Sequence, residues 1–205
     1  MMKKVIFAVA VAAVLWTLMF SPLTAPRLDF WWMMTGSACL LTLLSTLFRP
    51  HWWRGLSWTP ANILLGVALA AVLWGIFWTG DKVSSWLFNF ARPQVDAIYG
   101  IKEGTSACLL SFLLLFLIGP AEEIFWRGYV QHTFSIKWGR NTGFIVTSLI
   151  YALVHAPSCN FMLVMAAFVA GVVWGAVYRF FPERFPAVVI SHALWDAAVF
   201  VWFPI

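Results

Sequence analysis

Five ionisable side chains lie inside apolar segments, where such groups are costly. Three of the eight acidic residues, Glu122, Glu123 and Asp196, fall within long apolar runs, and so do His155 and His192. An ionisable group at membrane depth costs roughly 2.5–3.5 kcal/mol, so these groups face the interior of a helix bundle and pair with one another. All five follow residue 104. We therefore expect function to depend on the C-terminal half of the chain.

The spacing of these residues predicts which of them pair. Glu123 and Arg127 are four residues apart, so on a helix they share a face and can form an ion pair. Glu122 is rotated by about 100° from that face, which leaves its carboxylate free for other chemistry. His192 and Asp196 are also four apart, so Asp196 can orient the imidazole, or share a water or a metal with it.

A carboxylate and two imidazoles on three segments are enough to activate a water molecule. Glu122 can act as a general base, while His155 and His192 position the water and stabilise the oxyanion. The same three residues are also a plausible zinc site, because catalytic zinc combines His with carboxylate and keeps one position open for water. The sequence leaves the cofactor open between zinc and a metal-free glutamate mechanism.

Each of these groups also has a purely structural interpretation. Glu123–Arg127 can be an ion pair that only holds the helix. His155 can be a helix-end histidine bonded to a backbone carbonyl, and the pair formed by His192 and Asp196 can be a polar clasp between helices. Their joint occurrence in a chain that otherwise avoids charge favours a functional site.

The composition predicts the elements that must position these residues. Apolar residues make up 62% of the 205 residues and charged residues 10%, and the mean hydropathy is +0.86. Soluble domains are near 45–50% apolar and about 25% charged. This excludes an ordinary cytosolic enzyme, a disordered tail and a secreted disulfide scaffold. The basic residues are scattered rather than clustered, so the net charge of +5 does not indicate nucleic-acid binding.

We predict an all-α fold, a polytopic transmembrane helical bundle with about seven spans, since a span needs roughly 20 apolar residues. The fourth candidate contains Gly119-Pro120 and is either a kinked helix or two shorter pieces. In one integrated membrane domain, residues 1–104 are expected to be scaffold helices and residues 105–205 the catalytic core. The candidate spans are about 5–21, 30–48, 61–79, 105–130, 141–157, 161–180 and 186–204.

The basic residues predict the orientation of the bundle. With the N-terminus in the cytoplasm and the first helix retained, nine basic residues lie inside and four outside, as the positive-inside rule requires. The longest connection, about 80–104, is then outside. The inside residues are Lys3, Lys4, Arg49, Arg54, Arg127, Lys137, Arg140, Arg179 and Arg184, and the outside ones are Arg27, Lys82, Arg92 and Lys102. His51 is expected in a loop. The three cysteines, Cys39, Cys108 and Cys159, are expected to be small core residues rather than disulfides or ligands.

The ionisable residues fall into a pattern that resembles the CPBP family of intramembrane proteases. This family groups the CAAX prenyl endopeptidases of the Rce1 type with bacteriocin-processing and self-immunity proteins of the Abi family. The resemblance covers about residues 118–197. The chain has Tyr151 where the family usually has Phe, and Asp196 in place of the commoner Asn. The motifs are Glu122-Glu123-x-x-x-Arg127, Tyr151-x-x-x-His155 and His192-x-x-x-Asp196.

The resemblance implies roles for the site residues. Glu122 is expected to be the general base that activates water, while His155 and His192 bind the water, the oxyanion or a metal. Asp196 is expected to support His192. Members of the family have been described both as metalloproteases and as glutamate-dependent proteases, so the resemblance does not decide the cofactor either.

The expected reaction is hydrolysis of a peptide bond in a membrane-anchored protein or peptide, toward the cytoplasmic half of the bilayer. CAAX-like, bacteriocin and C-terminal sorting-tail processing are the candidate activities. The resemblance implies that Glu123 and Arg127 hold the helix and a substrate carbonyl or carboxylate. The compact chain favours the bacterial cytoplasmic membrane. The expected partners are this substrate and the lipid bilayer, with no nucleic acid.

Two other classes of function remain. One is a non-catalytic protein, for bacteriocin self-immunity or proton-coupled transport, that uses the buried carboxylates as a proton relay; the lack of evident inverted repeats and paired broken helices counts against it. The other is a cysteine transpeptidase using Cys159, which follows His155 by four residues. Pro157 interrupts the helix between these two residues. No His-Glu-x-x-His zinc motif occurs in the sequence.

Overall fold

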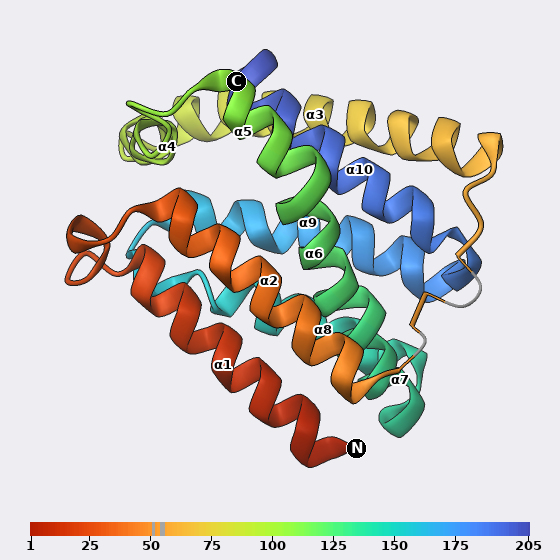
Figure 1. The fold of residues 1–205 in the computed structure, drawn as a ribbon. Helices are drawn as coiled ribbons and strands as arrows, with labels where there is room; N and C mark the ends of the chain where they lie inside the picture. Colours follow the sequence, from red (N-terminus) through yellow and green to blue (C-terminus); the bar gives the residue numbers. More distant parts are fainter. Residues whose placement is uncertain (51, 54–55) are drawn as a thin grey trace.

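The computed structural model describes residues 1–50, 52–53 and 56–205, so His51 and Arg54 lie outside the described residues. Every regular element within that part of the chain is helical (Figure 1). Six helical segments in it are long and apolar enough to cross a membrane. They are Met2–Phe20, Phe30–Phe48, Pro60–Leu87, Ala107–Trp138, Phe161–Phe180 and Pro182–Trp202.

The first four helices are α1 (Met2–Phe20), α2 (Phe30–Phe48), α3 (Pro60–Leu87) and α4 (Ala91–Gly100). The long fourth span combines α5 (Ala107–Leu113), the π-helical segment η2 (Leu114–Ile118), α6 (Gly119–Glu123), the π-helical segment η3 (Ile124–Gln131) and α7 (His132–Trp138). It is followed by α8 (Arg140–Leu153), α9 (Phe161–Phe180), α10 (Phe185–Ala197) and the π-helical segment η6 (Ala198–Trp202). Short 3-10 turns are η1 (Ala25–Arg27), η4 (Ala156–Ser158) and η5 (Pro182–Arg184).

The predicted all-α transmembrane bundle is confirmed. The six apolar segments correspond to six predicted spans, and α8 is the seventh, predicted at 141–157. With 14 residues, α8 is about 21 Å long, shorter than the hydrocarbon core of roughly 30 Å. The helix starts follow from local chemistry, because the side chains of Asp29, Thr59 and Asn160 accept hydrogen bonds from the free backbone N–H groups that begin α2, α3 and α9.

The predicted connection at 80–104 is largely helical. Helix α3 continues to Leu87 and α4 begins at Ala91. Asp81, near the end of α3, is buried and paired with Arg92 of α4 at 3.3 Å. This ion pair lets α3 continue past a carboxylate and fixes α4 beside its end.

The fourth span is one continuous helical run that contains two π-helical segments, rather than two separate shorter helices. Pro120 stands in the first turn of α6, directly after η2. A wider turn accommodates the missing N–H of a proline, and π-helical segments occur often at functional sites. The two segments η2 and η3 flank α6, which carries Glu122 and Glu123.

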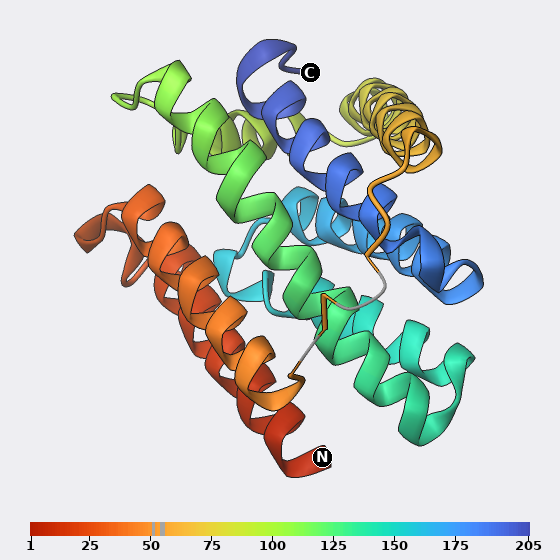
Figure 2. The ribbon, with the colours of Figure 1, turned by 45° about the vertical axis from the view of Figure 1, so that its right-hand side comes forward.

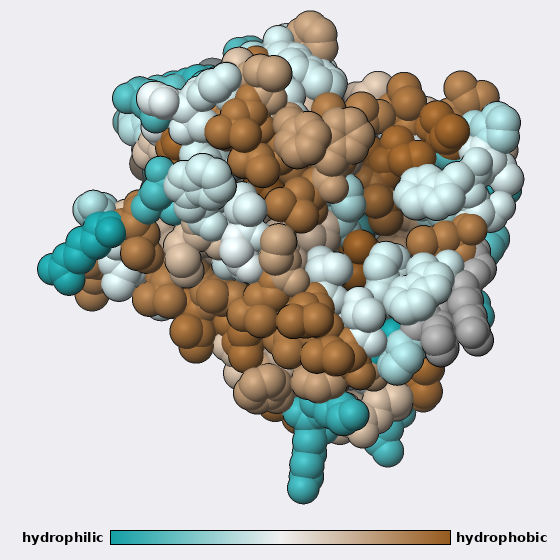
Figure 3. All heavy atoms as spheres, viewed as in Figure 1, coloured by the Kyte–Doolittle hydropathy of each residue, from teal (hydrophilic) through white to brown (hydrophobic). Residues whose placement is uncertain are grey.

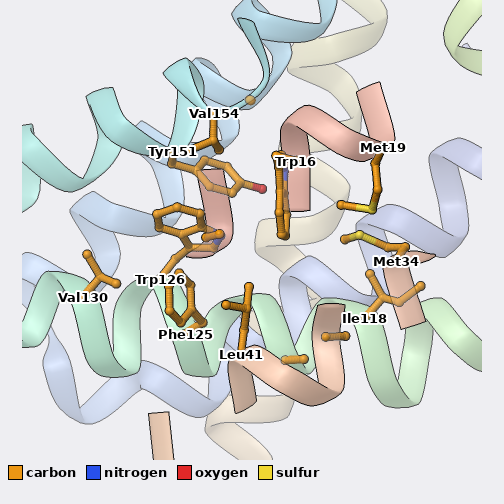
Figure 4. Packing of buried hydrophobic residues seen from close by; sticks show 14 of the residues in the cluster. Trp16, Met19, Met34, Leu41, Ile118, Phe125, Trp126, Val130, Tyr151 and Val154 are labelled. Carbon is orange, nitrogen blue, oxygen red and sulfur yellow. The ribbon is translucent and has the colours of Figure 1, made fainter. Parts of the chain in front are cut away.

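Figures 1 and 2 show α1 and α2 side by side on one flank of the bundle, α3 and α10 on another, and the long fourth span between them. The main apolar cluster joins both halves of the chain: it holds Trp16 of α1, Leu41 of α2, Trp126 of η3 and Tyr151 of α8 (Figure 4). The face seen in Figure 3 is largely apolar, with hydrophilic residues at its margins, as expected of a surface that faces lipid.

Two predictions about single residues are wrong. Arg127 was counted among the basic residues of the inside loops and helix ends, but it is buried within the bundle at 1% exposure. The three cysteines are free, yet they are exposed rather than part of the core: Cys39, Cys108 and Cys159. Without Arg127, seven described basic residues remain on the side predicted to be inside, against four on the other side. The seven are Lys3, Lys4, Arg49, Lys137, Arg140, Arg179 and Arg184.

Candidate active site

The structure brings the predicted site residues together from three elements. Glu122 and Glu123 come from α6, His192 and Asp196 from α10, and His155 from the turn after α8, and all five are buried.

The close approach of α6 and α10 depends on Gly119. A Cβ at this position would lie 2.7 Å from the Cα of Ala193. Only glycine lets the two backbones come this near, and this contact places Glu123 within reach of His192.

Glu123 is the centre of a buried charge network. Its Oε1 accepts hydrogen bonds from Arg127 Nη1 at 2.6 Å and from His192 Nδ1 at 2.7 Å. Arg127 also donates from Nη2 to the carbonyl oxygen of Gly171 at 3.2 Å. The predicted ion pair is therefore present, and Glu123 in addition holds one side of His192.

His192 lies between two carboxylates. Its Nδ1 contacts Glu123, and its Nε2 lies 3.4 Å from Asp196 Oδ2. The ring also stacks on Trp174 of α9, with 3.9 Å between ring centroids and 17° between planes. The imidazole is thus fixed in position and orientation by three side chains, and Asp196 is placed as expected for a residue that supports His192.

Glu122 has a different environment from Glu123. Its Oε2 accepts a hydrogen bond from the Tyr151 hydroxyl at 3.0 Å, and the residue lines a cavity. The ring of Tyr151 lies 4.8 Å from the Arg127 guanidinium, measured from Cζ to the ring centroid. Tyr151 therefore links the free carboxylate to the charge network, a contact that sequence reasoning missed. The available signal was the departure from the family's Phe.

Both nitrogens of His155 are used within the protein. Because a carbonyl only accepts, Nδ1 donates to the backbone oxygen of Tyr151 at 2.8 Å. Nε2 then accepts from the indole Nε1–H of Trp16 at 3.1 Å. The structural interpretation of His155, a helix-end histidine bonded to a backbone carbonyl, matches this geometry. Trp16 gave no signal in the sequence, since it lies in an apolar run.

The side chains do not fit a metal ion as they are arranged. Among residues 1–50, 52–53 and 56–205, no three His, Cys, Asp or Glu side chains are grouped so that they could hold one. The predicted set of Glu122, His155 and His192 has both ring nitrogens of each histidine facing other protein groups.

A cavity of about 570 Å³ lies beside these groups. Its wall is mostly apolar and aromatic, which suits the interior of a ligand pocket. The polar residues in the wall that belong to the site are Glu122, Tyr151, His155, His192 and Asp196. Helices α1 and α2 of the predicted scaffold half also contribute, through Trp16, Phe20, Phe30, Trp31 and Met34.

The cavity extends toward the end of the bundle away from Met1. Its wall includes Phe20 at the end of α1, Phe30 at the start of α2 and Tyr99 of α4, and Figure 1 shows α4 at the opposite end from the N-terminus. With the N-terminus in the cytoplasm, as the basic residues predict, the cavity extends toward the opposite side of the membrane.

The comparisons with known proteins agree with the motifs. Residues 104–198 match the family model described as type II CAAX prenyl endopeptidase Rce1-like. No curated protein and no solved structure gave a match. The matched segment contains all six predicted site residues and Tyr151. The resemblance to the CPBP intramembrane proteases is thus confirmed by this match, which covers residues 104–198 of an integral membrane protein.

Proposed function

We propose that this chain is an intramembrane endopeptidase in which Glu122 activates the attacking water. The observation that carries the proposal is the contrast between two adjacent carboxylates. Glu123 is fully buried and bonded to Arg127 and His192. Glu122 lines the cavity and receives one hydrogen bond, from Tyr151. Only Glu122 is therefore placed to take a proton from a water molecule in the cavity.

The reaction follows from these positions. Glu122 removes a proton from the water as its oxygen attacks the carbonyl carbon of the scissile peptide bond. The negative charge that develops on the carbonyl oxygen needs hydrogen-bond donors, and His192 and Tyr151 both line the cavity. When the C–N bond breaks, the protonated Glu122 returns its proton to the leaving amine. Glu123, Arg127 and Asp196 keep this arrangement rigid.

The proposed substrate is a membrane-anchored protein or peptide. An apolar cavity of about 570 Å³ can accept large apolar side chains, and it lies within a bundle whose outer surface suits lipid. CAAX-like, bacteriocin or sorting-tail segments all meet this description. We place the protein in the bacterial cytoplasmic membrane, with the N-terminus in the cytoplasm.

The test is a comparison of protein termini in membrane fractions from host cells that carry the wild-type chain, Glu122→Gln or Glu183→Gln. Glu183 is exposed and belongs to η5, so its variant controls for the loss of a carboxylate. A new C-terminal or juxtamembrane end should appear with wild type and Glu183→Gln, and be missing with Glu122→Gln at equal protein level. If all three membranes show identical termini, the self-immunity or transport function becomes the better proposal.

A further inference from the structure

Trp16 connects helix α1 to a site whose motifs all lie in the other half of the chain. Its indole is 1% exposed and donates from Nε1 to His155 Nε2 at 3.1 Å. The two rings also meet edge to face, with centroids 6.1 Å apart. In Figure 4, Trp16 lies close to Tyr151 and Trp126. Trp16 stands outside residues 104–198, the segment that matches the Rce1-like family.

The contact occupies the only free lone pair of His155. Because Nδ1 carries the proton that goes to the Tyr151 carbonyl, the ring is neutral and Nε2 is its single acceptor. The family resemblance implies that His155 binds the attacking water, and for this its Nε2 must accept a hydrogen bond from that water. In the arrangement seen here the histidine is held in place but is closed to any such contact.

The Trp16 indole is packed against Trp126 and His155, and the free space beside it is the cavity itself. Trp16 and His155 both line the cavity of about 570 Å³, so a substrate that enters it meets the indole directly. Helix α1 lies at the edge of the bundle and packs on α2 (Figures 1 and 2). Phe20, one turn after Trp16, touches the same histidine ring at 5.4 Å between centroids, but it has no donor.

We propose that Trp16 is a positioning residue that acts as a latch on His155. In the empty cavity its indole N–H caps Nε2. A substrate that fills the cavity displaces the indole, and His155 then becomes available to the water. Because Trp16 belongs to α1, this helix couples substrate binding to the activation of the water. The proposal rests on the proposed function for the use made of His155, whereas the latch itself can be tested without any substrate.

The direct test measures how fast diethyl pyrocarbonate modifies His155, since this reagent attacks an imidazole nitrogen with a free lone pair. Modified histidines are counted by peptide mass spectrometry in the full chain. Trp16→Phe removes the donor and keeps a ring. Losing one hydrogen bond of ordinary strength should speed the modification of His155 by about two- to tenfold. Modification of His192, which Trp16 does not contact, should stay unchanged.

Phe20→Ala is the matched control. It opens more space beside His155 than Trp16→Phe does, but it keeps the indole N–H on Nε2. His155 in this variant should react at the wild-type rate within about twofold. Equal acceleration in both variants would show that access, rather than the hydrogen bond, controls the ring, and would overturn the latch. No acceleration in Trp16→Phe would overturn it as well.

Cleavage kinetics on the substrate found by the terminus comparison complete the test. If substrate binding has to displace the indole, Trp16→Phe should lower KM by about two- to tenfold and leave kcat unchanged. A lower kcat with unchanged KM would mean that Trp16 only supports the fold. A change in His155 labelling combined with no cleavage by wild type would keep the latch and reject the protease, so the two failures are distinguishable.

Discussion

At the scale of single residues, Glu122 and Glu123 show how one helical step separates two functions. The same side-chain chemistry faces a charge network at one position and a cavity at the next. The sequence predicted this division, because four-residue spacing pairs Glu123 with Arg127 and rotates Glu122 away. It did not predict the groups that complete the site. Tyr151 and Trp16 act through a hydroxyl and an indole N–H, which sequence periodicity treats as ordinary aromatic core.

The Tyr151 hydroxyl supplies the one hydrogen bond to Glu122, so its removal should impair the chemical step. We expect Tyr151→Phe to lower kcat by about tenfold, in the range typical of groups that orient an active-site residue, with KM little changed. Tyr129→Phe is the control, since its hydroxyl is buried without a hydrogen-bond partner among the described residues. Equal kcat values for the two variants would remove Tyr151 from the mechanism.

At the scale of elements, the spans were predictable and their internal geometry was not. Apolar length is a direct property of the sequence, so six spans were found, although the third and fourth each extend eight residues beyond their predicted ends. The π-helical segments η2 and η3 lie on either side of α6, which carries Pro120 and Glu123 of the buried network. The apolar periodicity of the sequence does not indicate a π-helical turn. Helix α4 was missed because its Asp and Arg residues suggest a loop. In the structure Arg92 donates to Asp96 on the same helix and to Asp81 of α3.

The close contact between α6 and α10 at Gly119 should be sensitive to any added side chain. Gly119→Ala places a Cβ 2.7 Å from the Ala193 backbone, so the helices must separate and the Glu123–His192 bond must lengthen. We expect a loss of about 1–3 kcal/mol in stability together with lower activity, measured as thermal unfolding in detergent and as cleavage. Gly75→Ala in α3 is the control, because nothing lies within 4 Å of its added Cβ. Equal unfolding midpoints for the two variants would contradict the close-contact argument.

At the scale of the whole molecule, the direction in which the cavity extends relates the candidate site to the orientation of the bundle. Sequence reasoning set the orientation from basic residues and the site from motifs, and only the folded chain shows how the two relate. Glu122 lies near the middle of a span, so its position in the sequence did not indicate from which side of the membrane the site is reached. The cavity wall reaches α4, the last residue of α1 and the first residues of α2, so the cavity extends toward the end of the bundle away from Met1.

Cys159 reports this orientation experimentally. It is exposed and follows η4, and Phe161, two residues later, lines the cavity, whereas Cys39 and Cys108 stand on membrane-crossing segments. With the N-terminus in the cytoplasm, a membrane-impermeant maleimide added to intact cells should label Cys159. Labelling only after the cells are opened would place the cavity on the cytoplasmic side and reverse the orientation. Cys159→Ser should abolish the signal in either case.

The wall of the cavity is shared between the two halves of the chain. The segment that matches the Rce1-like family carries Glu122, His155, His192 and Asp196 together with part of the apolar wall, while α1 and α2 add Trp16, Phe20, Phe30, Trp31 and Met34. On the proposed function, part of the substrate pocket is therefore encoded outside the segment that carries the reaction chemistry. Exchanging the first two helices between members of the family should retarget cleavage while keeping the same hydrolytic centre.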